Sequence, residues 1–188
     1  MTTILGISGS LREASFNTKL LRAAIRLAPV GTTIEEASIR GIPVYDADDE
    51  AREFPAAVTA LKNRVIGANG VLLVTPEYNN GIPGAFKNAI DWLSRPAADI
   101  NKVFGGRPFG LIGATPGMGG TRYAQAAWLP VLRTLGTLSY FGGRLEVASA
   151  GKVFDESGVI VDAKIEELLG KYVAGFAKFV AEQSAPRG

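Results

Sequence analysis

The first 27 residues combine an apolar run, a loop of small polar residues and a helix pattern with one apolar face. Ile4, Leu5 and Ile7 form the run, and Ser8-Gly-Ser10 begins the loop. Apolar residues then recur at helical spacing through residues 20–28. The first N–H groups of a helix are unpaired and its dipole favours negative charge, so a strand that leads through such a loop into a helix is a common anion site. The segment therefore predicts a parallel α/β fold with an anion site near its start.

The polar groups of this loop indicate a terminal phosphate. The loop and the first helical turn carry three hydroxyls, one side-chain amide and one guanidinium, from Ser10, Ser15, Thr18, Asn17 and Arg12. This density of donors suits a phosphate monoester. The Walker A pattern and the three-glycine dinucleotide pattern are both absent from this stretch. The alternative is an ordinary turn in which Ser15 or Asn17 only caps the helix.

Composition narrows the chemistry. The 188 residues, of which 47% are hydrophobic and 20% charged, suit one globular domain spanning 1–188. The sequence has no cysteine and no histidine, which excludes thiol nucleophiles and thiolate metal sites and favours a borrowed cofactor. A net charge of +2 argues against a nucleic-acid partner, and no apolar run is long enough to span a bilayer. We expect a soluble, cytoplasmic protein without a metal site.

Strand and helix patterns alternate along the chain and predict five parallel strands covered by helices on both faces. After the first strand, the expected strands lie in residues 33–39, 70–75, 108–114 and 142–150. The expected later helices begin near Pro55, cover 84–94, follow a leucine pattern from Leu129 to Leu138, and close the chain over 163–182. The acidic segment 46–53 is expected to be an irregular surface loop. The common doubly wound order is 2-1-3-4-5, which places ligands beyond the carboxyl ends of strands 1 and 3.

Two further loops contain groups that suit a flat ring. Pro76-Glu-Tyr-Asn79 follows the third strand, and Thr115-Pro-Gly-Met-Gly-Gly120 follows the fourth. Glycines let backbone N–H groups approach a ring edge, and Tyr78 offers an aromatic surface. A flat heteroaromatic ring with one terminal phosphate describes FMN, which also supplies redox chemistry to a histidine-free chain. Taken singly, each loop is also compatible with an ordinary Pro/Gly turn.

Three stretches carry a family resemblance: GSLREASFN, VTPEYNNGIPGAFKNAIDWLSRP and AGKVFDESG. They resemble the flavodoxin-like NADPH-dependent FMN reductases, especially the bacterial quinone, ferric and chromate reductase branch. The resemblance implies a three-layer flavodoxin-like fold with bound FMN. It also implies ping-pong hydride transfer from NADH or NADPH through flavin N5 to quinones, ferric complexes, chromate or free flavin. A homodimer or dimer of dimers with flavin sites at the interface is expected.

The same resemblance implies which residues bind the cofactor. The phosphate end is assigned to Ser10, Leu11, Arg12, Ser15, Asn17 and Thr18, the ring to Pro76, Glu77, Tyr78 and Asn79, and the pyrimidine end to Thr115, Gly117, Met118 and Gly119. FMN carries the chemistry, so the candidate catalytic residues are only Glu77, Tyr78 and Arg95. Glu77 facing solvent or pairing with a surface base is the alternative. The helix after Pro83 runs away from the flavin loop, so we expect Arg95 to reach the partner subunit's pocket across a two-fold axis.

Other functions remain compatible with these motifs. A flavin reductase that uses FMN as a diffusing substrate for a partner monooxygenase has the same loops. A non-enzymatic flavodoxin-like electron carrier is less compatible, because such carriers are strongly acidic. A regulatory domain without redox chemistry is a third possibility. The sequence leaves open the physiological acceptor, the choice between NADH and NADPH, dimer against tetramer, and whether FMN is prosthetic or exchangeable.

Overall fold

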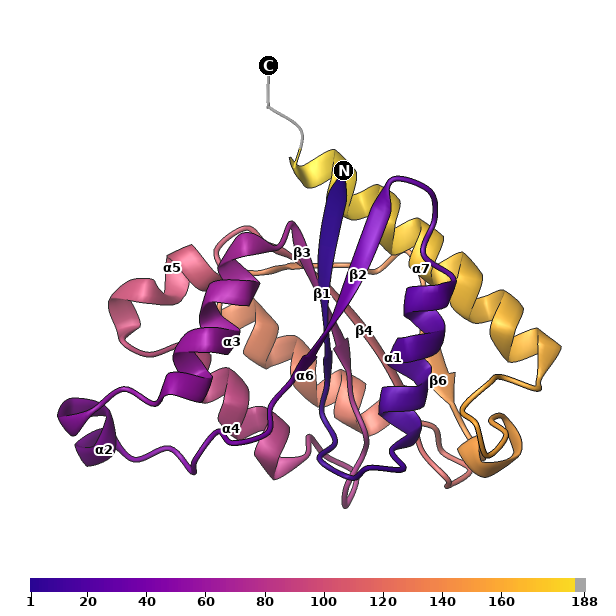
Figure 1. Cartoon of the computed structure of the whole chain (residues 1–188), viewed down its shortest axis with the longest axis horizontal. Coiled ribbons are helices and arrows are strands. Elements are labelled where there is room, and N and C mark those ends of the chain that lie inside the picture. The colour runs from indigo at the N-terminus through magenta and orange to yellow at the C-terminus, as the bar shows by residue number, and fades with distance from the viewer. Residues whose placement is uncertain (185–188) are drawn as a thin grey trace.

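The computed structural model describes residues 1–184, which form a parallel sheet between two layers of helices (Figure 1). The strand order is β2-β1-β3-β4-β5, and β6 also pairs with β4. The strands are β1 Thr2–Ser8, β2 Thr32–Ser38, β3 Gly70–Val74, β4 Pro108–Ala114, β5 Leu138–Ser139 and β6 Leu145–Val147. The predicted doubly wound order and the flavodoxin-like fold are confirmed.

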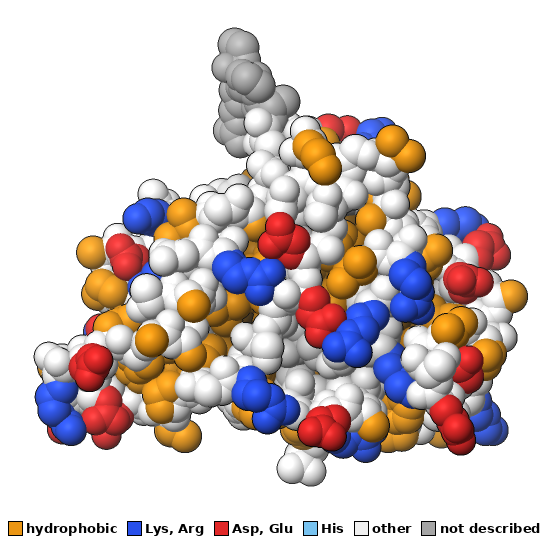
Figure 2. Space-filling view, in the orientation of Figure 1, with side chains coloured by type: hydrophobic (Ala, Val, Ile, Leu, Met, Phe, Trp, Pro, Cys, Tyr) orange, Lys and Arg blue, Asp and Glu red, His pale blue; other side chains and the backbone are white. Residues whose placement is uncertain are grey.

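Helices α1 and α7 cover one face of the sheet, and α3, α4 and α6 cover the other. The helices are α1 Phe16–Arg26, α2 Ala47–Arg52, α3 Ala56–Gly67, α4 Gly84–Leu93, α5 Ile100–Val103, α6 Arg122–Thr134 and α7 Ala163–Ser184. None of these helices, within residues 1–184, is both long and apolar enough to cross a membrane. Acidic and basic side chains are interspersed over the face seen in Figure 2.

Alternation along the strands divides the core between the two layers. Ile4 packs with α1 and α7, whereas Leu5 and Ile7 pack with the helices of the other face. Successive side chains of a strand point to opposite faces, so a strand buried on both sides is a continuous apolar run. All five residues of β3 are buried, as expected for a central strand. The sheet therefore holds the three polar loops at one edge of a rigid core.

Three local expectations are wrong in detail. The fifth strand expected over 142–150 is only the short β6, and a separate short strand, β5, precedes it; the two pair with opposite ends of β4. Leu138 lies in β5 and not in the preceding helix, because α6 ends before Gly136, whose φ of 74° favours glycine. The acidic segment contains α2, which begins where the Asp46 carboxylate accepts the N–H of Asp48 at 2.8 Å.

Pro130 lies inside α6, where it removes one helical hydrogen bond. Both Pro130 and Ala126, the residue four positions earlier, are exposed. Water can therefore replace the missing partner of the Ala126 carbonyl, and the helix continues to Thr134.

Candidate functional site

The loops after β1, β3 and β4 meet at the lower edge of the sheet in Figure 1 and enclose a cavity of about 230 Å³. We call it the three-loop cavity. It is lined by Ser10, Arg12, Ser15, Phe16, Asn17, Pro76, Glu77, Tyr78, Ala114, Thr115 and Pro116. Parallel strands end at the same edge, which is why segments about 100 residues apart in sequence share one cavity. The cavity lies at the predicted switch between β1 and β3.

Ser15 caps α1 and lines the cavity at the same time. Its side-chain oxygen accepts the N–H groups of Asn17 at 3.2 Å and Thr18 at 3.3 Å. The hydroxyl hydrogen of Ser15 is still a donor, because both cap bonds use only the oxygen. The capping and phosphate-binding interpretations of this residue are therefore compatible.

Asn17 joins the first loop to the third. Its amide nitrogen donates to the carbonyl of Ala114 at 2.8 Å, and its amide oxygen accepts the N–H of Ala114 at 2.9 Å. The side chain is buried, and one of its two amide hydrogens remains for a ligand. Holding α1 against the end of β4 is thus its first role, and no local sequence pattern indicates this contact.

Arg12 is exposed at the mouth of the cavity. One terminal nitrogen donates to the carbonyl of Ala14 at 2.7 Å, and the guanidinium lies 5.5 Å from the ring centroid of Phe16. The remaining N–H groups are available to an anion. Phe16 was not among the predicted residues, although its place directly after Ser15 is visible in the sequence. Two predicted residues lie outside the lining: Leu11 is exposed, and the Thr18 hydroxyl lies 3.0 Å from that of Ser8.

Gly9 allows the first loop to pack on α4. Its N–H donates to the carbonyl of Val74 at 2.9 Å, and a Cβ at this position would lie 2.1 Å from Cδ1 of Phe86. Phe86 is fully buried and its ring meets that of Trp128 at 5.1 Å. Any side chain at residue 9 would therefore displace the floor beneath the loop.

Glu77 caps α6 from outside the helix. One carboxylate oxygen accepts the N–H groups of Tyr123 at 2.8 Å and Ala124 at 2.9 Å. The helix's own N-cap residue, Thr121, makes no capping hydrogen bond with its side chain. Glu77 thus neither faces solvent freely nor pairs with a base, because its carboxylate ties the second loop to the helix after the third.

Tyr78 and Asn79 belong to a tight hairpin at the tip of the second loop. Tyr78 and Gly81 exchange two backbone hydrogen bonds, of 3.2 and 3.0 Å. Asn79 and Asn80 between them both have positive φ, of 50° and 58°, as a two-residue primed turn requires. Tyr78 is 54% exposed at the rim of the cavity, while Asn79 lies beyond it.

The third loop is held by the end of β6 and by the residues that follow it. The Thr115 N–H donates to the carbonyl of Val147 and the Ser149 N–H to that of Gly117, each at 2.9 Å. Thr115 and Pro116 line the cavity. Three predicted residues of this loop lie outside the lining and are exposed: Gly117, Met118 and Gly119.

Arg95 lies past the far end of α4 and anchors α2. Its Nε donates to a carboxylate oxygen of Glu50 at 2.9 Å, and the Tyr45 hydroxyl donates to the same oxygen at 2.9 Å. The hydrogen bond from Arg95 lowers the pKa of the Glu50 carboxyl below its usual value. Within one subunit Arg95 is therefore remote from the three-loop cavity, and its place in a partner's pocket stays a prediction.

These contacts define what the cavity can do. Hydroxyl, amide and guanidinium donors meet at the N-terminus of α1, and the aromatic side chains of Phe16 and Tyr78 also line the cavity. Within residues 1–184 no cluster of acidic side chains could hold a metal ion, and the one carboxylate in the lining is engaged by α6. Such a site suits a phosphorylated planar molecule, and a bound cofactor is the natural source of its redox chemistry.

Residues 2–151 match the model of the family described as NADPH-dependent FMN reductase. The chain belongs to this family. It is therefore an oxidoreductase that uses FMN and a reduced nicotinamide nucleotide, as the three motifs led us to expect. The donor set at the start of α1 fits the phosphate of FMN, and the rims of the second and third loops fit a flat ring.

Similarity to individual proteins extends over almost the whole chain. An NAD(P)H-dependent FMN reductase of Pseudomonas aeruginosa is 41% identical over 166 residues, 88% of each chain. A 2-hydroxy-1,4-benzoquinone reductase of Burkholderia sp is 34% identical over 177 residues, 94% of this chain and 95% of that one. The solved structure of FerB, a flavoenzyme NAD(P)H:(acceptor) oxidoreductase from Paracoccus denitrificans, has a TM-score of 0.87 at 31% identity and covers 97% of this chain and 99% of its own.

Proposed function

We propose that this protein transfers a hydride from NADH or NADPH, through FMN held in the three-loop cavity, to quinones and other small acceptors. The observation that carries the proposal is the donor set at the N-terminus of α1, which opens onto a cavity rimmed by Tyr78. The name of the Burkholderia relative, a benzoquinone reductase, supports quinones as acceptors. Ferric complexes and chromate are further acceptors within the same proposal.

Each part of the cavity has a separate task in this proposal. Ser10, Arg12 and Ser15 bind the phosphate by charge-assisted hydrogen bonds. Glu77 keeps the second loop fixed on α6, so that the backbone of this loop meets the ring edge in one geometry. FMN supplies the hydride chemistry when bound. Tyr78 stands at the rim and is free to contact the acceptor.

A homodimer or a dimer of dimers is part of the proposal, with α4 directed toward the partner and Arg95 near its pocket. The charge of Arg95 would then favour anionic acceptors such as chromate. A cytoplasmic location likewise stays a prediction.

A second candidate, a flavin reductase that releases FMN to a partner monooxygenase, is favoured by the open mouth of the cavity. Arg12 is exposed and Tyr78 is more than half exposed, so little protein covers a ligand there. The P. aeruginosa relative is also named for FMN reduction.

The test is steady-state oxidation of NADH and NADPH by the purified protein with quinones, free flavin, ferric chelates and chromate. We expect the highest kcat/KM with quinones and a protein that stays yellow after desalting. A colourless protein that reduces added FMN faster than any quinone would establish the second candidate. Absence of nucleotide oxidation with every acceptor would refute both.

A further inference from the structure

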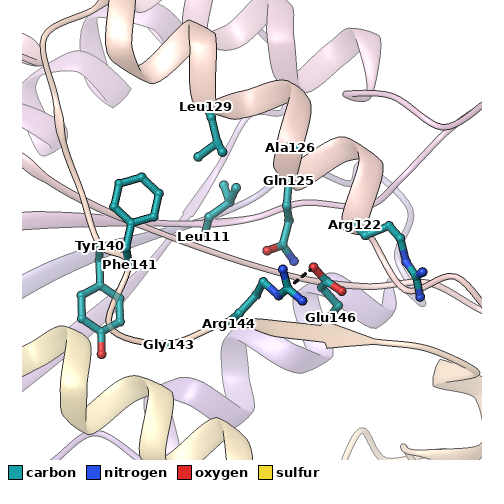
Figure 3. Close-up of a pocket in the computed structure, with 10 residues that line it drawn as sticks. All are labelled: Leu111, Arg122, Gln125, Ala126, Leu129, Tyr140, Phe141, Gly143, Arg144 and Glu146. Atoms are coloured by element: carbon teal, nitrogen blue, oxygen red, sulfur yellow. Dashed lines mark ion pairs between the residues drawn. The ribbon is translucent and has the colours of Figure 1, made fainter.

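A second cavity, of about 500 Å³, lies beside α6 and shares no residue with the three-loop cavity. Its walls are α6, the middle of β4, and residues 140–146, which cover the connection from β5 and the start of β6 (Figure 3). We propose that this α6 cavity binds the adenosine 2′-phosphate end of NADPH. The inference rests on the proposed function, because it assigns a place to the nucleotide that supplies the hydride.

The apolar part of the α6 cavity suits a planar base. Leu111, Leu129 and Phe141 contribute apolar surface, and Phe141 is 76% exposed although it is a large aromatic residue. Phe141 and Leu129 lie toward one end of the cavity in Figure 3, with Arg122 toward the other. A purine ring that covers Phe141 removes apolar surface from water.

Gln125 supplies a fixed hydrogen-bond acceptor at the floor. Only 7% of the residue is exposed, and its amide nitrogen donates to Thr121 Oγ1 and to the carbonyl of Leu145, both at 2.9 Å. The amide cannot be turned over, because the Leu145 carbonyl can only accept. The amide oxygen receives no hydrogen bond from the described residues. It is not fully buried, because every fully buried polar side-chain atom within residues 1–184 has a partner. That oxygen therefore opens to the cavity, where it can accept an exocyclic N–H of adenine.

Two arginines offer groups for a phosphate. Arg122 Nε donates to the carbonyl of Gly119 at 2.8 Å, and Arg144 Nε lies 3.3 Å from a carboxylate oxygen of Glu146. Both guanidiniums keep their terminal nitrogens free of other contacts within the described part of the chain, and such forks bind phosphate in two-point fashion. The negative charge of the Glu146 carboxylate would repel an anion, but Arg144 neutralises that charge. The three side chains together carry one net positive charge.

The third loop connects the two cavities along the chain, because Thr115 and Pro116 line the three-loop cavity and Arg122 lines the α6 cavity. Arg122 is the first residue of α6 and contacts Gly119, which belongs to the third loop. From Arg122 to Leu129 the helix advances about 10 Å along its axis. A dinucleotide is an extended molecule, so its adenosine can lie beside α6 while its nicotinamide lies at the flavin.

NADPH and NADH differ only in the 2′-phosphate, which makes the pair a matched probe. Arg144→Ala is the main variant, because the side chain is 80% exposed and its loss should leave the fold intact. We expect the KM for NADPH to rise about tenfold, the loss typical of one charge-assisted hydrogen bond, while the KM for NADH stays within about twofold. Glu146→Gln should lower the KM for NADPH, because it frees Arg144. Arg133→Ala, on α6 but outside this cavity, is the control and should change neither constant.

Calorimetric binding of adenosine 2′,5′-bisphosphate decides the inference independently of turnover. Binding to the wild-type protein that weakens about tenfold in Arg144→Ala and strengthens in Glu146→Gln supports it. Absence of binding, as when a second copy of the chain covers the cavity, overturns it. Equal changes in the KM values of NADPH and NADH in an active enzyme also overturn it and leave the proposed function standing. Failure of nucleotide oxidation altogether refutes the proposed function, while the calorimetry still decides whether this cavity is a nucleotide site.

Discussion

The carboxylate of Glu77 accepts the backbone N–H of Tyr123 at 2.8 Å, across 46 positions of sequence. The contact joins the loop after β3 to the first turn of α6, which directly follows the third loop, so two of the three loops around the cavity are held together. Glu77 therefore positions the second loop, and the catalytic role that the motif suggested for it stays a prediction. An uncapped α6 would leave N–H groups without a protein partner beside the cavity.

Replacing Glu77 should distinguish a positioning role from a catalytic one. We expect Glu77→Ala to lower the free energy of unfolding by about 0.5–2 kcal/mol, as for loss of a cap, and to weaken FMN binding. Glu77→Gln keeps an acceptor oxygen, so it should retain most of the stability and most of the FMN affinity. Only the interaction of the charge with the helix terminus is lost, which costs about 0.3–1 kcal/mol of stability. Denaturant unfolding and flavin fluorescence titration measure these quantities. Loss of catalysis in Glu77→Gln, with FMN affinity unchanged, would instead support a catalytic role for Glu77.

Arg12 should contribute to FMN affinity and little to folding, because it is exposed and bonded only within its own loop. Arg12→Ala should weaken FMN binding by about 1.5–3 kcal/mol, the range for hydrogen bonds to charged groups, with an unchanged melting temperature of the apoprotein. Arg64→Ala, an exposed arginine on α3, is the matched control. Equal FMN dissociation constants for Arg12→Ala and the control would remove Arg12 from the site.

Asn17 should be as important for the fold as for the ligand. Asn17→Ala leaves the N–H and the carbonyl of the buried residue Ala114 unpaired, and each such group costs about 1–3 kcal/mol. Chemical denaturation of the apoprotein should show this loss before any flavin is added. Unchanged apoprotein stability, with weaker FMN binding alone, would make Asn17 a ligand residue only.

The Glu50 and Arg95 pair predicts a specific loss of stability in acid. Arg95, Tyr45 and Lys62 face the Glu50 carboxyl, and the lowered folded-state pKa means that its contribution is complete above the unfolded value of about 4.3. It is lost as the pH falls through the folded-state pKa. Glu50→Gln should therefore flatten this part of the curve of melting temperature against pH, while the exposed Glu53→Gln should not. The same fall of melting temperature with pH in both variants would contradict this role of Glu50.

Arg95 also tests the shared site. If α4 brings it to the partner's pocket, Arg95→Ala should raise the KM for chromate more than for a neutral quinone and leave the FMN content unchanged. Sedimentation of the same protein should show a dimer or larger. A monomer, or equal effects on both acceptors, would confine Arg95 to anchoring α2.

Local patterns in the sequence determined the order and type of the main elements. Continuous apolar runs specify strands buried on both faces, and the small-residue loop before α1 specifies a helix N-terminus that can bind an anion. Parallel connection then requires the ends of β1, β3 and β4 to meet, so the position of the site followed from the alternation alone. These features depend on near neighbours along the chain, which is why they were visible in the sequence.

Tertiary structure decided which polar groups are already engaged. Asn17 binds Ala114, Glu77 binds the N-terminus of α6, and Arg95 binds Glu50, in each case across at least 45 positions. The α6 cavity likewise depends on the break between β5 and β6, which periodicity did not show. A hydrogen bond between distant residues leaves no local pattern, because either partner alone is an ordinary polar side chain. The sequence by itself thus determined where the three loops meet, and only the packing of distant segments decided which of their side chains remain free to bind a ligand.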